Sequence, residues 1–147
     1  MPTAEHYRAL ERMYVSAPTN AYYAPAISIH EGRAEISVSV RPEFCHAAGA
    51  VHGAVYFKML DDAAFFAANS LVDDWFLVTV SFNVYFTRPV SEGQLRAVGH
   101  VVHLFRRLFI AEAILTDANG REIARGSGTF MSSNIPLASV ADYGQAG

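Results

Sequence analysis

Two residues that could together handle a carbonyl group stand close together in the chain. Gly53 lies where a long apolar segment begins, and Asp61 follows eight residues later. If the segment is a helix, the N–H groups of its first turn have no helical partner and lie at the positive end of the helix dipole. Such donors can stabilise a developing oxyanion and remove roughly 3–4 kcal/mol of barrier. A carboxylate in reach could direct water at the same carbonyl.

The spacing of these two residues implies a second chain. Eight residues at about 1.5 Å each place Asp61 about 12 Å along the helix from Gly53. Asp61 therefore cannot act on a carbonyl held at the N-terminus of its own helix. Two antiparallel helices related by a two-fold axis would bring Gly53 of one chain beside Asp61 of the other. The sequence predicts an obligate homodimer with shared sites, and further assembly into tetramers stays open.

The helix that must carry both residues is predicted over 53–71. This segment is rich in Ala, Leu, Met and Phe, lacks Pro, and is apolar almost all round, which is typical of a buried helix. A hairpin over 25–40, turning at Glu31-Gly32, is expected before it. β-Branched and aromatic residues predict four strands after it, at 76–87, 94–104, 107–116 and 121–131.

The remaining segments complete one predicted domain over 1–147. Residues 3–15 favour a short amphipathic helix with Thr3 as its cap, and 19–24 favour a connecting loop. Residues 134–147 are small and polar and predict a flexible tail. One helix followed by consecutive strands gives a mostly antiparallel sheet that must cover that helix.

This order of elements, with His46, then His52-Gly53, then Asp61, resembles the hotdog superfamily. Within it, the closest likeness is to the PaaI-like and 4-hydroxybenzoyl-CoA thioesterase group. The resemblance covers roughly residues 25–131 and includes the strand VTVSFNVYFTRPV, with Thr79 and Asn83 ahead of Pro89. It implies an α+β hotdog fold, in which an antiparallel sheet wraps around one long buried helix, here with a short extra N-terminal helix.

The resemblance also implies an acyl-CoA thioesterase activity and a role for each matched residue. His46 and the Gly53 N–H would polarise the thioester carbonyl. Asp61 of the partner chain would act as general base or as nucleophile, and Thr79 would position water. Ala54 stands where the group usually has a second glycine, so its methyl would narrow the substrate path. No metal or organic cofactor is expected, and coenzyme A enters only as part of the substrate.

Further substrate contacts are expected around the helix and at the rim of the site. The candidates are His52, Ala54, Phe57, Phe82, Asn83, Arg88, Arg106 and Arg107. Arginines could bind the phosphates of coenzyme A, although solvated surface charge explains any single one equally simply. For His52, orientation of the loop is favoured over substrate contact.

Simpler structural interpretations compete with these roles. Asp62 is expected to form a solvated pair with Lys58 at i,i+4, whereas Asp61 lies among apolar residues, where a carboxylate is costly without a partner or a function. Cys45 adjoins His46, but no third residue orients such a pair, so an inert packed thiol is favoured. No metal-ligand spacing and no GxSxG motif occur.

Composition limits the other function classes. The net charge is -3 with no basic stripe, which argues against nucleic-acid binding. A single cysteine indicates a reducing compartment, and no apolar stretch reaches the ~20 residues of a membrane span. A cytoplasmic protein without a membrane partner is therefore expected.

Two alternative functions stay open on the same fold. One is an acyl-thioester dehydratase or hydratase, which the absence of a histidine within a turn of Asp61 disfavours. The other is a non-catalytic acyl-CoA-binding module.

Overall fold

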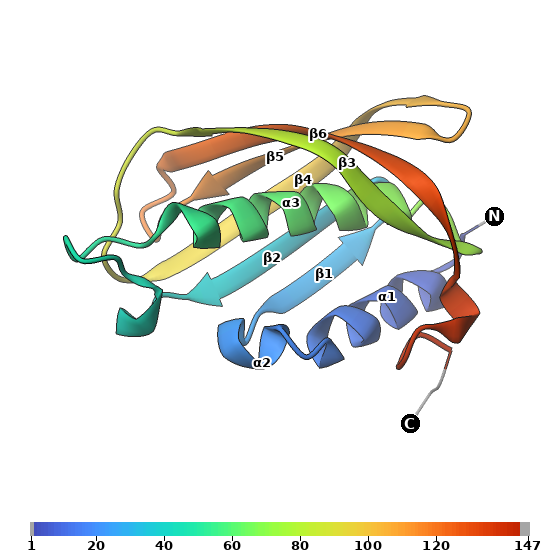
Figure 1. Cartoon of the computed structure of the whole chain (residues 1–147), viewed down its shortest axis with the longest axis horizontal. Helices are drawn as coiled ribbons and strands as arrows, with labels where there is room; N and C mark the ends of the chain where they lie inside the picture. The colour runs from blue at the N-terminus through green and yellow to red at the C-terminus, as the bar shows by residue number, and fades with distance from the viewer. Residues whose placement is uncertain (1, 145–147) are drawn as a thin grey trace.

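Helix α3 (Gly53–Asn69) lies against one face of a six-stranded sheet, as Figure 1 shows. In this computed structural model, which describes residues 2–144, the strand order is β1-β2-β4-β5-β6-β3 and each pair is antiparallel. The strands are β1 (Ala26–His30), β2 (Arg33–Ser39), β3 (Trp75–Phe86), β4 (Gln94–Phe105), β5 (Leu108–Thr116) and β6 (Glu122–Pro136). The predicted α+β arrangement of a long helix wrapped by an antiparallel sheet is confirmed.

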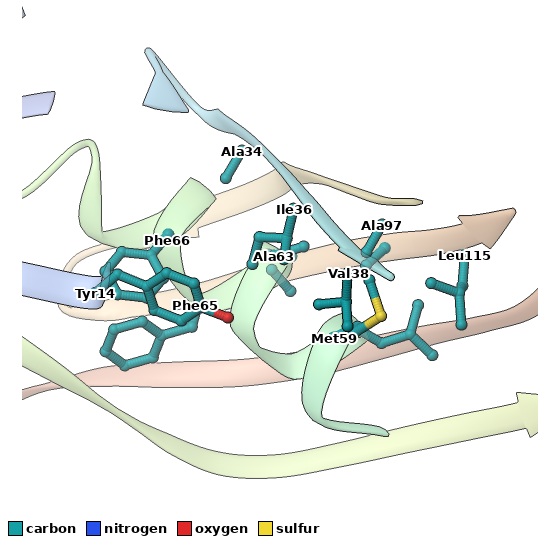
Figure 2. Close-up of a cluster of buried hydrophobic side chains, with 14 of the residues drawn as sticks. Tyr14, Ala34, Ile36, Val38, Met59, Ala63, Phe65, Phe66, Ala97 and Leu115 are labelled. Atoms are coloured by element: carbon teal, nitrogen blue, oxygen red, sulfur yellow. The ribbon is translucent and has the colours of Figure 1, made fainter. Parts of the chain in front are cut away.

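Small residues let α3 approach the sheet closely. Ala63, Ala64, Ala67 and Ala68 have no exposed surface. On the facing strand β4, a Cβ atom at Gly99 would come within 2.3 Å of the Ala63 carbonyl oxygen, so only glycine fits there. Figure 2 shows part of the core between helix and sheet, with Met59 and Ala63 of α3 facing Val38, Ala97 and Leu115.

Helix α1 (Ala4–Ser16) begins as predicted, because the Thr3 hydroxyl accepts a hydrogen bond from the His6 N–H. It is fastened to β1 through Ile29, whose carbonyl accepts from Arg8 and whose N–H donates to Glu11. The predicted loop over 19–24 is wrong in part, because α2 (Asn20–Tyr23) forms one helical turn there. The buried Asn20 amide donates to the Tyr14 carbonyl and holds this turn against α1.

The C-terminal segment differs from the predicted flexible tail. Strand β6 continues to Pro136, and a 3-10 turn, η2 (Leu137–Ser139), follows it. Leu137 is fully buried, and its N–H donates to the Asp74 carbonyl. Small polar residues suggested fraying, but one anchored leucine is enough to pack the segment. Residues 145–147 of the predicted tail lie outside the described residues.

Candidate active site

Asp61 and Thr79 meet between helix and sheet. The Thr79 hydroxyl of β3 donates a hydrogen bond of 3.0 Å to Oδ1 of Asp61 on α3. Strand β3 is the last strand in the sheet order, so this contact lies along an edge that carries no further strand in the described chain. The sequence predicted both residues for one site, and the structure brings them together.

The environment of Asp61 raises its proton affinity. Partial burial is the largest influence and raises the pKa of Asp61 to about 6, and the neighbouring Asp62 carboxylate acts in the same direction. The hydrogen bond from Thr79 and the charge of Lys58 oppose this rise. A carboxylate with such a pKa is still mostly ionised at neutral pH, and it is more basic than an ordinary aspartate.

Asp62 points away from Asp61 into its own network. Its Oδ2 accepts hydrogen bonds from Lys58 Nζ at 2.6 Å and from the Tyr14 hydroxyl of α1 at 2.7 Å. Lys58 also lies over the rings of Tyr14 and Tyr23. The predicted Lys58–Asp62 pair therefore forms, but beneath α1 and largely shielded from water rather than solvated.

A cavity of about 760 Å³ opens beside Asp61 and Thr79. Its wall is mostly apolar and is contributed by α3, β3, the C-terminal end of α1 and the segment after η2. The apolar lining includes Met13, Ala17, Pro18, Phe65, Phe66, Phe76, Leu77, Val78, Val140 and Ala141. Figure 2 shows Tyr14, Phe65 and Phe66 gathered at this end of α3, and the ring centroids of Tyr14 and Phe66 are 4.9 Å apart.

The other predicted half of the site lies at the N-terminus of α3. His52 caps the helix, because its Nδ1 accepts from the Ala54 N–H at 2.9 Å, which agrees with the orienting role favoured for it. Among the described residues, the Gly53 N–H has no hydrogen-bond acceptor. His46 is exposed, and its Nδ1 accepts from Ala48, which leaves Nε2 for a ligand.

Within one chain the two halves line different cavities. His46 and Gly53 line a second cavity of about 360 Å³ with Tyr56, Phe86 and Arg88. Neither Asp61 nor any other residue of the first cavity belongs to it. The separation agrees with the spacing argument from the sequence: one chain does not place its own carboxylate at its own helix N-terminus.

The remaining residues that were predicted to contact substrate lie in different parts of the chain's surface and core. Phe57 and Phe82 touch edge-to-face, with ring centroids 5.6 Å apart, on the side of the sheet that holds α3. Arg88 lies near Gly53, whereas Arg106 and Arg107 form the β4–β5 turn, at a separate small cavity beside Asp73 and Asp74. The structure therefore does not gather the three arginines around one phosphate site in one chain.

Asn83, a predicted substrate contact, faces away from Asp61. A β-bulge between Thr79 and Ser81 adds one residue to β3 and reverses the alternation that follows. Phe82 therefore turns toward α3, and Asn83 lines a cavity on the outer face of the sheet with His100 and Glu112. The predicted substrate contact by Asn83 is not supported within one chain.

Sequence reasoning missed the contributions of α1 and the C-terminal segment to the cavity. Tyr14 was recognised only as part of the apolar side of a helix, and Val140 lay in a predicted tail. Nothing in the local pattern shows that either segment packs against α3. In residues 2–144 no group of three or more His, Cys, Asp or Glu could hold a metal ion.

Comparison with known proteins now defines the class. The family model of the Thioesterase superfamily matches residues 48–124, and the chain belongs to this family. A Mycobacterium tuberculosis protein named "Putative esterase" is 33% identical over 97 residues, which are 63% of this chain and 69% of that protein. Its solved structure superposes with a TM-score of 0.74 at 26% identity, covering 80% of this chain and 97% of that one.

Other solved structures establish the hotdog fold. The PaaI protein of the Escherichia coli phenylacetic acid degradation operon has a TM-score of 0.83 at 19% identity, covering 92% and 99% of the two chains. A thioesterase from Haemophilus influenzae has a TM-score of 0.76 at 17% identity, covering 84% and 88%. The predicted PaaI-like resemblance is confirmed at the level of fold and family. Among the described helices, none is both long and apolar enough to span a bilayer.

Proposed function

We propose that this protein is an acyl-CoA thioesterase, which hydrolyses an acyl-CoA to the free acid and coenzyme A. The observation that carries the proposal is the hydrogen bond from Thr79 to Asp61 at the mouth of an apolar cavity. A half-buried carboxylate held by a hydroxyl, beside a space that accepts an apolar group, supplies what attack on a thioester requires.

The proposed reaction divides its work between two chains. Asp61 takes a proton from a water molecule that Thr79 helps to position, and the water oxygen attacks the thioester carbon. The Gly53 N–H of the partner chain donates to the resulting oxyanion, assisted by His46 Nε2. The C–S bond then breaks, coenzyme A leaves as a thiolate, and the proton held by Asp61 passes to the thiolate or to solvent. Attack by Asp61 itself, through an anhydride, is the alternative; turnover in ¹⁸O-water distinguishes the two, because only the anhydride route labels Asp61.

The surface of the chain favours the homodimer that this reaction needs. On α3, Ala54 and Phe57 are exposed on the same stripe as Asp61. Beside them β3 is unpaired along one edge, and Val80 on it is 56% exposed. An apolar helix stripe beside a free strand edge is suited to a second copy related by a two-fold axis. That copy would bring its Gly53 toward Asp61.

A substrate panel tests the activity. Purified protein is incubated with acetyl-, hexanoyl-, decanoyl-, benzoyl- and phenylacetyl-CoA, and free thiol is measured. Hydrolysis of at least one member above the uncatalysed rate is expected. Binding without thiol release would support the binding-module alternative instead. Hydration of an enoyl-CoA without thiol release would support the hydratase, although no histidine lines the Asp61 cavity in the described chain.

Mixed dimers test the sharing of sites. Asp61→Asn chains and Gly53→Val chains are each expected to be inactive, because every site then lacks one half. Subunit exchange in a 1:1 mixture gives half mixed dimers, each with one intact site, so about a quarter of wild-type activity should return. Native mass spectrometry of the 1:1 mixture is the control for exchange, because the mixed dimer differs in mass from both parent dimers. No recovery despite proven exchange would contradict the shared site.

A further inference from the structure

The cavity beside Asp61 is closed at its far end by segments outside the matched family region. Residues 48–124 supply Asp61, Thr79 and the aromatic floor. The opposite walls come from the end of α1, through Met13 and Tyr14, and from Val140, Ala141 and Asp142 after η2. Both walls therefore come from segments outside the part of the chain that the family model matches.

Tyr143 fastens the C-terminal wall. Its hydroxyl lies 2.7 Å from Nδ1 of His6, and its carbonyl accepts from Arg12 at 3.2 Å. His6 is buried, and its Nε2 lies 2.9 Å from the Asn69 carbonyl, so that Nε2 donates and Nδ1 accepts from Tyr143. Because Asn69 ends α3, this chain of contacts connects residues 140–143 to the helix that carries Asp61.

Three polar residues of the cavity wall, Lys58, Asp62 and Tyr14, are paired with one another. Asp62 accepts from both Lys58 and Tyr14, so none of the three presents an uncompensated charge to a ligand. Most of the remaining lining is aromatic or aliphatic and includes Phe65, Phe66 and Phe76, although Ser16, Thr19, Asn20 and Asp142 also contribute to it. Such a wall favours an uncharged, apolar group and penalises one bearing a carboxylate or an ammonium.

We infer that residues 140–143 form the wall that limits the length of the acyl group, with Tyr143 as the positioning residue that holds this wall in place. The inference rests on the proposed function, because it takes the cavity beside Asp61 as the acyl site. The substrate class is then a thioester of an uncharged apolar acid, and the distance from Asp61 to Val140 sets the largest acyl group admitted.

Changes at Val140 test the wall directly. Val140→Phe narrows the end of the cavity formed by residues 140–143, so kcat/KM for decanoyl-CoA should fall by about tenfold through a higher KM, with acetyl-CoA almost unaffected. Val140→Ala should shift the preference toward longer chains. Val15→Phe is the matched control, because Val15 is exposed on α1 and does not line this cavity. Thermal unfolding of each variant checks that it is folded.

Removal of the Tyr143 hydroxyl tests whether Tyr143 holds residues 140–143 in place. Tyr143→Phe should change the decanoyl-to-acetyl ratio of kcat/KM by about fivefold, the value of one hydrogen bond, while kcat for acetyl-CoA stays constant. Tyr22→Phe is the control, because it removes a comparable bond from Tyr22 to the Glu43 carbonyl, away from the cavity. Equal chain-length profiles in wild type, Val140→Phe, Val140→Ala and Tyr143→Phe would overturn the inference and leave the thioesterase standing.

Binding separates failure of the inference from failure of the proposed function. S-alkyl-CoA thioethers of increasing length cannot be hydrolysed, and their affinity is measured by calorimetry for the wild type and both Val140 variants. A wild type that binds them with a length limit moved by Val140, yet releases no thiol from the substrate panel, would refute the thioesterase and keep the wall. Absence of both binding and hydrolysis would refute both.

Discussion

The Asp61 cavity and the Gly53 end of helix α3 differ in how far one chain completes them. Around Asp61 the hydroxyl of Thr79 is already in place, and four separate segments form the wall. Around Gly53 the loop is exposed, and the backbone N–H has no acceptor in the described chain. The half of the proposed site that holds Asp61 and Thr79 is therefore preorganised within one chain. The half at Gly53 is left open, so that it can receive the carbonyl of a substrate bound in the partner chain's Asp61 cavity.

The largest expected effect comes from the preorganised half. Asp61→Asn should lower kcat/KM by about 100-fold or more, because removing a general base costs on that order. Burial raises the pKa of Asp61, so its ionised form destabilises the fold at neutral pH, and the variant should unfold at an equal or higher temperature there. The measurements are thiol release and thermal unfolding at pH 7 and 8. Near-normal turnover would remove Asp61 from the mechanism.

The hydroxyl of Thr79 gives the next effect. Thr79→Ala should reduce kcat by about tenfold, less than loss of the base itself. The hydrogen bond from Thr79 lowers the pKa of Asp61, so its loss should also move the acidic limb of the pH–rate profile upward from about 6. Thr79→Ser keeps a hydroxyl and serves as the rescue control. An unchanged limb in Thr79→Ala would separate Thr79 from the ionisation of Asp61.

A smaller effect is expected from the neighbouring carboxylate. Asp62→Asn removes a negative charge that raises the pKa of Asp61 and leaves Lys58, which lowers it, without its partner. In the proposed mechanism activity requires ionised Asp61 and is lost as the pH falls through its pKa, so the acidic limb should move downward. The pH dependence of kcat/KM between pH 4.5 and 8 checks this, with Glu43→Gln as an exposed control. A limb that stays near pH 6 would show that Asp62 does not tune the site.

The smallest effect belongs to the open half. His52→Ala removes the side-chain cap of α3 and should lower the free energy of unfolding by about 1 kcal/mol. KM should change little if His52 only orients the helix. His30→Ala, at an exposed histidine on β1, is the control. A large rise in KM with unchanged stability would make His52 a substrate contact and narrow the difference between the two halves.

The sequence predicted the features that depend on alternation and spacing. The apolar segment after Gly53 indicated the buried helix. The spacing between Gly53 and Asp61 predicted that these two residues lie apart within one chain. Thr79 came from the resemblance, and its contact with Asp61 agrees with it. The prediction of the helix and the separation of Gly53 from Asp61 rest on local periodicity and on fixed helical rise, whereas Thr79 rests on the resemblance alone.

The failures have a different physical origin. The outward position of Asn83 was not predicted, because a one-residue bulge leaves no clear mark in the composition of β3, yet it reverses every later side chain. The walls at Tyr14 and Val140 depend on contacts between residues far apart in the sequence, which periodicity does not reveal. The positions of Arg88, Arg106 and Arg107 likewise depend on which turns lie at the same end of the sheet. Their contacts with the phosphates of coenzyme A stay a prediction.

Gly99 is the point on β4 at which helix α3, which carries Asp61, approaches the sheet most tightly. The Ala63 carbonyl lies so near it that even a methyl group could not be inserted, and Ala63 is only two positions after Asp61. The depth of the helix, and with it the reach of its carboxylate toward β3, is therefore fixed by the absence of a side chain on the far strand. A residue without a side chain thus sets the position of the proposed catalytic carboxylate.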